Sequence, residues 1–232
     1  MVKSNILSAT KANNLFWLGR YEARVYMTLH FMNKCYDKMI DGKPADYMDL
    51  WTKLDVTGLY DTPEAFTLGM LYDENNPSSL ISAQRLAMDN AILLREDLTS
   101  ETLSYLEMSM ALMRRGKAAA QTSIIEFQPV IDWSLAFWGS AEQRVQNHRA
   151  VTLMMLGRCV ENMDLLTRFG YPQRRIHHVL EALQRHTIGM DDMLDDNMLE
   201  QVVDMIESPM FDLSNDEFKY TLLKYANQIV RV

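Results

Sequence analysis

The sequence predicts an all-α fold, a single helical bundle of long and short helices over residues 1–232. Apolar residues recur at steps of three and four through most of the chain, which places them on one face of successive helices. No stretch of useful length alternates with the period of two that is typical of strands. The 18 methionines, together with leucine and alanine, also favour helix over sheet.

The first predicted helix runs from about Lys11 to Ile40, before the turn sequence at residues 41–44. Two of its residues are unusual. Glu22 is a carboxylate on an apolar face, which indicates a buried and paired charge. Gly19 lies in an early turn, where glycine costs about 1 kcal/mol relative to alanine, so we expect another backbone to approach it closely. The apolar seam consists of Leu15, Leu18, Glu22, Val25, Leu29, Met32, Tyr36 and Met39.

Two short helices are expected next, over residues 45–54 and 63–72. The second has a typical N-cap in Thr62, and proline is favoured in its first turn. A longer helix follows the capped start Asn76-Pro77-Ser78-Ser79 and covers residues 80–98. Small and apolar residues form its predicted inner face: Leu80, Ala83, Ala87, Ala91, Leu94 and Leu98.

The second half of the chain contains further helices with recognisable start or stop residues. One begins at Thr99 or Ser100 and ends at Arg114-Arg115-Gly116. The stretch 117–139 contains Pro129, so we expect a kink or break near Phe127. The remaining predicted helices are 141–169, ended by Phe169-Gly170-Tyr171-Pro172; 173–188; 191–207; and 216–229, with Ser214 and Glu217 as a capping box.

The composition excludes several classes of function. The net charge of −8 argues against general binding to nucleic acid or to an anionic membrane, since both need a basic face. No apolar run approaches the roughly 20 residues of a membrane span. Residues 1–14 contain no apolar core of a signal peptide, so we expect a cytoplasmic protein. Cys35 and Cys159 form no CxxC motif, and we expect both to be free, buried thiols.

A short motif occurs twice, as Leu18-Gly19-Arg20 and again as Leu156-Gly157-Arg158. In the second copy, the glycine shares a helical stripe with two carboxylates and a guanidinium, at steps of four, three and four. We therefore predict two similar helices packed face to face, with a polar cluster between them. The stripe consists of Gly157, Glu161, Asp164 and Arg168.

Further polar residues are candidates for the same cluster. Arg20 and Arg24 flank Glu22 in the first helix. The simpler interpretation is a salt-bridge network that fixes the register of the helices, although desolvation makes such pairs poor stabilisers. The alternative is a polar pocket in which arginines orient a small ligand or a substrate carboxylate. The helix over 80–98 adds Asp89, Asn90 and Arg95.

Other kinds of chemistry have weaker support in the sequence. No glutamate has a histidine three residues later, and His177, His178 and His186 have no matching acidic cluster, so we expect no metal site. HExxH, P-loop and GxGxxG motifs are absent, and we expect no cofactor. Ser78 and Ser79 sit at a helix start that is able to bind an anion, although serines there more often only cap the helix.

Three segments, taken in order, resemble the alpha-E domain, a bacterial helical family. The first family motif, close to WLGRYLERAENTAR, is matched by residues 17–28, which include Arg20, Tyr21 and Arg24. The middle motif, NPSSI followed by AARENARxxRDxLSSE, is matched over 76–101, and the late motif, LGRYLERADNTSR, over 156–168.

The departures from these motifs indicate a divergent member. The glutamates of the first motif fall on Ala23 and Tyr26, which leaves only the displaced Glu22. The late motif keeps both of its acids but has Asn162 in place of an arginine. If the acids of the family are catalytic, this copy has lost half of the site.

The resemblance implies a partner. Alpha-E domains are typically encoded beside, or fused to, a circularly permuted ATP-grasp ligase, often with a transglutaminase-like cysteine peptidase. ATP-grasp enzymes activate a carboxylate as an acyl phosphate and join it to an amine. The implied setting is peptide or amide bond formation, or modification of a peptide substrate.

Three hypotheses follow for the function. The chain is an interaction subunit of the ligase that neither binds nor hydrolyses ATP alone; or an enzyme that uses Glu161 and Asp164 as acid and base on a peptide or amide; or a structural oligomer that dimerises through the acidic subregion 191–232. Between His186 and Lys219 there are ten acids and no lysine or arginine, which is typical of a solvated face or a docking surface for a basic partner.

Overall fold

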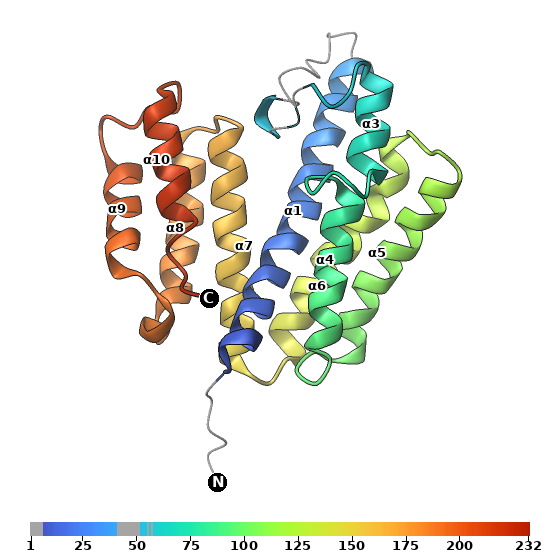
Figure 1. Cartoon of the computed structure of the whole chain (residues 1–232). Helices are drawn as coiled ribbons and strands as arrows, with labels where there is room; N and C mark the ends of the chain where they lie inside the picture. The colour runs from blue at the N-terminus through green and yellow to red at the C-terminus, as the bar shows by residue number, and fades with distance from the viewer. Residues whose placement is uncertain (1–6, 41–51, 55, 57) are drawn as a thin grey trace. The chain divides into compact units, whose positions relative to one another are not determined.

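The computed structural model describes residues 7–40, 52–54, 56 and 58–232, and it confirms the all-α prediction (Figure 1). Within these residues, the only strand-like pairing is an isolated bridge between Leu194 and Val230. The short helix predicted over 45–54 falls largely on residues outside the described part. The helices are α1 (Ala9–Ile40), α3 (Pro63–Tyr72), α4 (Leu80–Leu93), α5 (Ser100–Ala118), α6 (Gln128–Arg144), α7 (His148–Arg168), α8 (Gln173–Thr187), α9 (Asp196–Glu207) and α10 (Asp216–Ala226), with 3₁₀ turns η1 (Ile124–Phe127) and η2 (Asp191–Met193).

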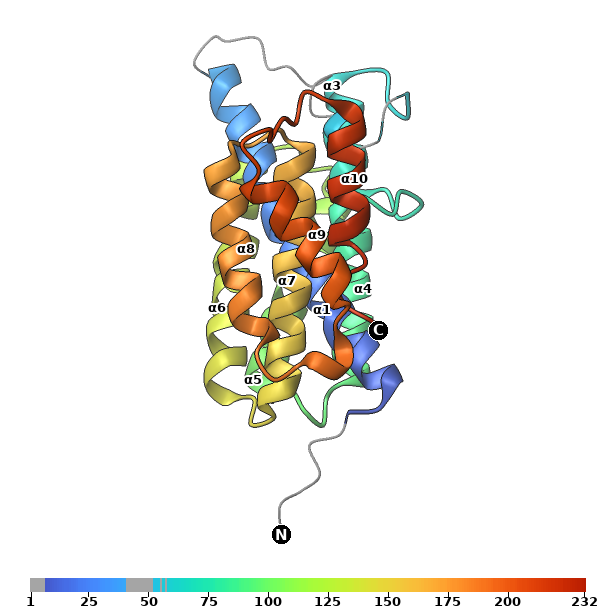
Figure 2. The ribbon, with the colours of Figure 1, turned by 90° about the vertical axis from the view of Figure 1, so that its left-hand side faces the viewer.

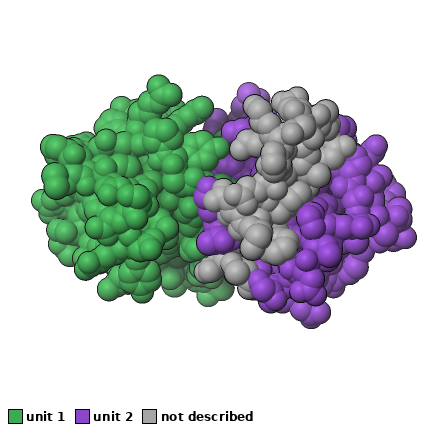
Figure 3. Space-filling view, turned by 90° about the horizontal axis from the view of Figure 1, so that it is seen from above, with its two compact units in different colours: residues 1–23, 146–232 green, residues 24–145 purple. Residues whose placement is uncertain are grey.

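The chain forms two compact units, coloured separately in Figure 3. Unit 1 contains residues 1–23 and 146–232, and unit 2 contains residues 24–145. Helix α1 therefore contributes its first half to unit 1 and its second half to unit 2. The sequence did not predict this division, and the single domain over 1–232 stays a prediction. None of the helices in the described ranges combines the length and the apolar character that a membrane span needs.

Unit 1 is built around α7, which packs against α8 and α10, while α9 joins α8 and α10 on the side seen in Figure 2. The buried face of α7 is apolar along most of its length, and Leu153, Met154 and Val160 are fully buried. The seam predicted for α1 is also confirmed, because its members up to Met32 are all buried. Burial of Glu22 confirms that this seam includes a carboxylate.

Unit 2 stacks α4 on α5 and α5 on α6, and α3 contacts α4 and α5. The predicted inner face of α4 is confirmed: Ala83, Ala87 and Ala91 are fully buried, and such small residues let a neighbouring helix approach closely. A buried hydrogen bond of 2.8 Å between the hydroxyls of Thr102 and Ser140 joins α5 to α6.

Several predicted helix ends are confirmed by their caps. The side chains of Thr62, Ser79 and Thr99 each accept a hydrogen bond from a backbone N–H of the first turn of α3, α4 and α5 respectively. The break expected near Phe127 is present, since Pro129 lies in the first turn of α6, where its missing N–H costs nothing.

Other predicted boundaries are wrong. The helix expected over 141–169 is divided, because α6 continues to Arg144 and the Asn147 side chain caps a new helix by accepting from the Ala150 N–H. Helix α4 ends at Leu93 rather than at 98, and Gly116 does not stop α5, which continues to Ala118.

The last helix also differs from its prediction. Its cap is Asn215, which accepts from the Phe218 N–H, and not Ser214. It ends at Ala226 because the chain beyond it pairs with the segment before α9: the Ile229 carbonyl accepts from the Asp195 N–H at 2.8 Å.

The two LGR glycines mark a close crossing of α1 and α7 within unit 1. A Cβ atom built on Gly19 would lie 2.0 Å from the carbonyl oxygen of Met154, and one built on Gly157 would lie 2.1 Å from that of Phe16. The contacts are reciprocal, since Met154 precedes Gly157 by three residues and Phe16 precedes Gly19 by three. The repeated motif is therefore a repeated packing contact, and the prediction that the LGR helices pack together is confirmed.

Gly157→Ala tests this crossing. The added methyl would overlap a backbone carbonyl that cannot rotate away, so we expect the free energy of unfolding to fall by about 1–3 kcal/mol or more. The matched control is Gly139→Ala in α6, where nothing lies within 4 Å of the added Cβ. That variant should gain about 1 kcal/mol from helix propensity. Urea denaturation of both variants gives the comparison, and equal effects would contradict the close crossing.

Candidate functional site

The polar residue of the first LGR motif, Arg20, forms a buried ion pair across the crossing. Its Nε donates to Oε2 of Glu161 on α7 at 2.7 Å. Arg20 is 6% exposed and Glu161 is 1% exposed, so neither charge is solvated by bulk water. Such a pair contributes little net stability but strongly penalises the loss of one partner.

Two aromatic rings of α1 also contact the Arg20 guanidinium. Its Cζ lies 5.0 Å from the ring centroid of Trp17 and 5.9 Å from that of Phe16, both within the range of a cation–π contact. The Tyr21 ring stacks on Trp17, with centroids 5.3 Å apart. Because three neighbouring side chains restrict the guanidinium, its remaining N–H groups have a fixed direction.

A side chain from the last helix completes the site. Oδ1 of Asn227 accepts from Nη1 of Arg20 at 2.6 Å, and its Nδ2 donates at 2.8 Å to Oδ2 of Asp164 and at 2.8 Å to the Leu223 carbonyl. The other oxygen of Asp164, Oδ1, accepts from Nε of Arg168 at 2.5 Å.

We call the five residues Arg20, Glu161, Asp164, Arg168 and Asn227 the Arg20 cluster. It is a continuous chain of hydrogen bonds from the interior to the surface of unit 1. Glu161 is its buried end, while Arg168 has a side chain that is 34% exposed and Asn227 is exposed. Two cationic and two anionic groups make the cluster neutral, which is a requirement for charges at this depth.

Two further candidates from the LGR helices lie partly exposed to solvent. Arg158, the second LGR arginine, and Arg24 are half-buried. Cys159 is buried beside Arg158, and burial raises the pKa of its thiol to about 11. The thiol is therefore neutral near pH 7 and is a poor nucleophile.

The candidates in the middle motif belong to unit 2 and serve helix α4. The Asn76 side chain accepts from the Ser78 N–H at 2.9 Å and donates to the Tyr60 hydroxyl at 2.9 Å. The Ser79 hydroxyl donates to the Asp73 carbonyl at 2.6 Å and accepts from the Ser82 N–H. The Asn76 side-chain oxygen and the Ser79 hydroxyl bond to nearby backbone groups, which supports the capping interpretation over an anion site.

The other middle-motif candidates lie toward the surface of unit 2. Asp89 is exposed and pairs with Arg85 one turn earlier, at 3.5 Å. Arg95 is exposed and Asn90 is half-buried. Their membership in a common polar pocket with the LGR residues stays a prediction.

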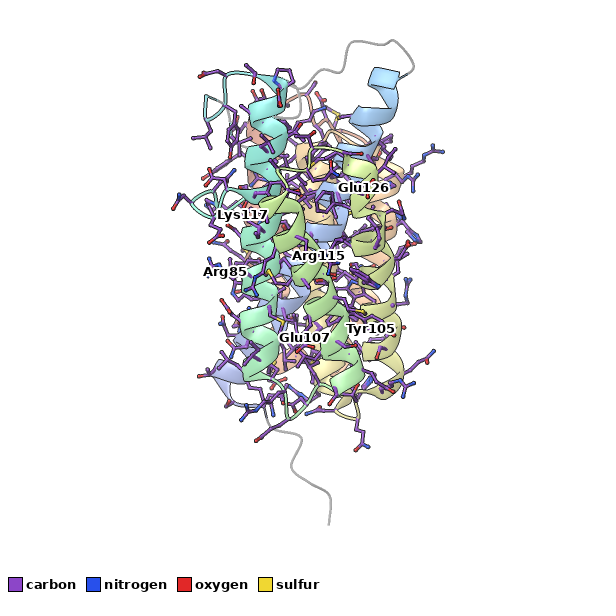
Figure 4. The ribbon with its side chains drawn as sticks, turned by 90° about the vertical axis from the view of Figure 1, so that its right-hand side faces the viewer. Arg85, Tyr105, Glu107, Arg115, Lys117 and Glu126 are labelled. Carbon is purple, nitrogen blue, oxygen red and sulfur yellow. The ribbon has the colours of Figure 1, made fainter. Side chains whose placement is uncertain are left out.

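Unit 2 carries a shallow groove of about 300 Å³ between α4 and α5. Arg85 and Glu107, labelled in Figure 4, lie on α4 and α5 and both line it. The lining combines charged groups with methionine and isoleucine side chains: Arg85, Met88, Asp89, Ile92, Glu107, Met110, Ala111 and Arg114. The mixed charges give the groove no single preference for cations or anions.

Two histidines of α8, His177 and His178, form surface pairs with carboxylates. His177 lies 3.7 Å from Glu181 and 3.8 Å from Glu207, and His178 lies 3.6 Å from Glu181. In the part of the chain that the structure covers, no group of three or more His, Cys, Asp and Glu side chains is arranged to hold a metal ion.

Comparison with known proteins identifies the family. Residues 7–207 match the model of Alpha-E, described as a predicted alpha-helical domain with a conserved ER motif. The chain belongs to the Alpha-E family. No curated protein and no solved structure matches this Alpha-E chain.

This Alpha-E member has no intact ER motif, because its sequence contains no Glu-Arg dipeptide. In the aligned motifs, the first copy reads Ala23-Arg24 and the second reads Glu161-Asn162. The Arg20–Glu161 pair joins the first LGR motif to the second copy. In the first motif, the position that corresponds to Glu161 is Ala23, which has no carboxylate.

Asn227 was not among the residues predicted for the polar cluster. It lies at the end of α10, beyond the family match, in no repeated motif. An asparagine at the end of a helix is common for conformational reasons, so its identity alone gave no indication of a link to Arg20 and Asp164.

A double-mutant cycle tests the buried pair. Arg20→Met leaves the Glu161 carboxylate without its guanidinium, and we expect the free energy of unfolding to fall by about 3–5 kcal/mol. The double variant Arg20→Met/Glu161→Leu should lose less than the sum of the two single losses, because no buried charge remains.

Chemical denaturation of the four proteins gives the coupling energy. The same cycle at Arg85 and Asp89, an exposed pair, is the control and should give less than about 1 kcal/mol. A coupling as small between Arg20 and Glu161 would contradict the buried pair.

Proposed function

We propose that this Alpha-E chain is a non-catalytic helical subunit that binds a circularly permuted ATP-grasp ligase and helps to shape the acceptor site for peptide or amide bond formation. Membership in the family supports the partnership. The state of the two candidate catalytic acids supports the non-catalytic role: Glu161 is bonded to Arg20, and Asp164 is bonded to Arg168 and Asn227. A general acid or base must instead reach the proton that it transfers.

Helix α9 offers the surface for a partner. Four acids at steps of four, four and three form an exposed stripe on it, while Val202 and Ile206 face the core of unit 1. Other acids of this region have internal roles, since Asp192 pairs with Arg149 and Asp195 caps α9. The stripe, which we call the α9 acidic stripe, consists of Asp196, Glu200, Asp204 and Glu207.

The α9 acidic stripe favours a heterologous partner over self-association. Two copies that met through this stripe would place like charges opposite each other, which costs affinity. A basic surface on the ligase would instead be attracted, and association would weaken as salt increases. Dimerisation through the acidic subregion is therefore the less favoured alternative, and a concentration-independent monomer in size-exclusion chromatography would exclude it.

Charge reversal on α9 tests the partnership. Glu200→Lys/Asp204→Lys should weaken binding to the ATP-grasp protein at least tenfold at low salt, mainly by slowing association. Glu96→Lys/Glu142→Lys makes the same change in net charge on exposed positions of unit 2 and is the control. Surface plasmon resonance at two salt concentrations gives the rates. Equal affinities for the two double variants would contradict a role for α9, and ATP turnover by the isolated chain would contradict the non-catalytic role.

Glu161→Gln separates the accessory role from the acid–base alternative. Glutamine keeps an oxygen acceptor for Arg20 but cannot exchange a proton. We expect product formation by the reconstituted pair to change less than about twofold, whereas loss of a general acid or base typically costs about 10²–10⁴-fold. Circular dichroism and partner binding are measured on the same samples. A loss of 100-fold with both of these retained would favour the enzyme hypothesis.

A further inference from the structure

The Asn227 carboxamide makes hydrogen bonds to three groups of unit 1: the Arg20 guanidinium, the Asp164 carboxylate and the Leu223 carbonyl. A guanidinium only donates hydrogen bonds and a carboxylate only accepts them. Arg20 and Asp164 therefore fix which end of the carboxamide faces each of them, and the oxygen faces Arg20. The second N–H of the carboxamide is taken by the Leu223 carbonyl, so every strong donor of the amide nitrogen has an acceptor.

This geometry selects one chemical group. A carboxylate in place of the amide would set an oxygen against the Asp164 oxygen and would be repelled. An ammonium would be repelled by Arg20. A peptide bond presents one N–H only, so it donates to Asp164 or to the Leu223 carbonyl but not to both; the Leu223 carbonyl also accepts from the Asn227 backbone N–H at 3.1 Å. A primary carboxamide, which has one acceptor and two donors on one planar group, satisfies all three.

The position of the amide permits exchange with a ligand. Arg20 and Asp164 are both buried, whereas Asn227 is exposed, so the carboxamide fills the last place between two buried charged groups and solvent. Asn227 follows the last residue of α10, and only its side chain has to move for exchange, because the backbone beyond it is held by the hydrogen bond from the Asp195 N–H to the Ile229 carbonyl. It also lies beyond the segment that matches the family, which ends at residue 207.

We propose that Arg20, Asp164 and the Leu223 carbonyl form a binding site for a primary carboxamide, and that Asn227 occupies this site as an internal substitute for the ligand. The external ligand is an asparagine or glutamine side chain or a C-terminal amide, and it enters when the Asn227 side chain rotates away. The site is independent of the partnership with the ligase.

The test is to remove the internal amide and supply one in solution. Asn227→Ala should retain the fold, because residue 227 has right-handed helical dihedral angles (φ −74°, ψ −7°) that alanine adopts freely. We expect a lower unfolding midpoint than in the wild type, and a saturable rise when acetamide is added. At ten times the dissociation constant, the rise should be about 3–6 °C. The wild type, whose site is filled, should show no saturable rise.

The ligand series establishes the recognised groups. Acetamide should act more strongly than N-methylacetamide, which lacks one N–H, and N,N-dimethylacetamide and acetate should not act. The control variant is Asn215→Ala, which loses a cap on the same helix but creates no amide-sized gap beside Arg20. It reports any general effect of amides on α10.

Two outcomes overturn the proposal. One is an equal acetamide effect in Asn227→Ala, Asn215→Ala and the wild type, which would mean that the effect is non-specific. The other is a stronger effect of acetate than of acetamide, which would make the gap an anion site. If Asn227→Ala is unfolded without additive, recovery of the native near-ultraviolet circular dichroism on titration with acetamide is the readout, and Asn227→Gly repeats it; failure of acetamide to restore either variant also overturns the proposal.

Discussion

The contact between two backbones at Gly19 and Gly157 is the constraint on which unit 1 depends. At each glycine, a backbone carbonyl of the facing helix lies so close that an added Cβ atom would overlap it. Close approach of α1 and α7 brings Arg20 within 2.7 Å of Glu161, which lies one turn beyond the second glycine. The ion pair is therefore a consequence of the crossing, which the two glycines make possible.

The crossing also explains why the interior of unit 1 tolerates charge. A buried ion pair alone costs about as much in desolvation as it returns in attraction. Here the Arg20 guanidinium additionally contacts two aromatic rings and the Asn227 carboxamide, so both its Nε and its Nη1 donate to side chains. The Asp164 carboxylate is satisfied in the same way from Arg168 and Asn227. These contacts join α1, α7 and α10 in one hydrogen-bonded network.

Periodicity and the LGR repeat were sufficient to predict this crossing, the buried Glu22 and the opposed charges, because these features are local patterns on two helices. The division of 141–169 into two helices was not predicted, since the cap at Asn147 lies inside an otherwise continuous pattern. Asn227 could not be predicted at all. Its contact with Arg20 spans 207 positions in sequence. The contact depends on where α10 packs, and the spacing of apolar residues does not predict this.

The neutrality of the Arg20 cluster determines what is able to complete it. Two guanidinium groups and two carboxylates already cancel, so another ion at the mouth of the cluster would be left without a counter-charge in a partly dry site. An apolar group would leave an N–H of Arg20 and an oxygen of Asp164 unsatisfied, at about 1–3 kcal/mol each. A neutral group with separated donor and acceptor ends avoids both costs. The carboxamide is the smallest protein side-chain group of this kind with two donors, which is the physical reason that an asparagine, rather than a fifth charged residue, closes the cluster.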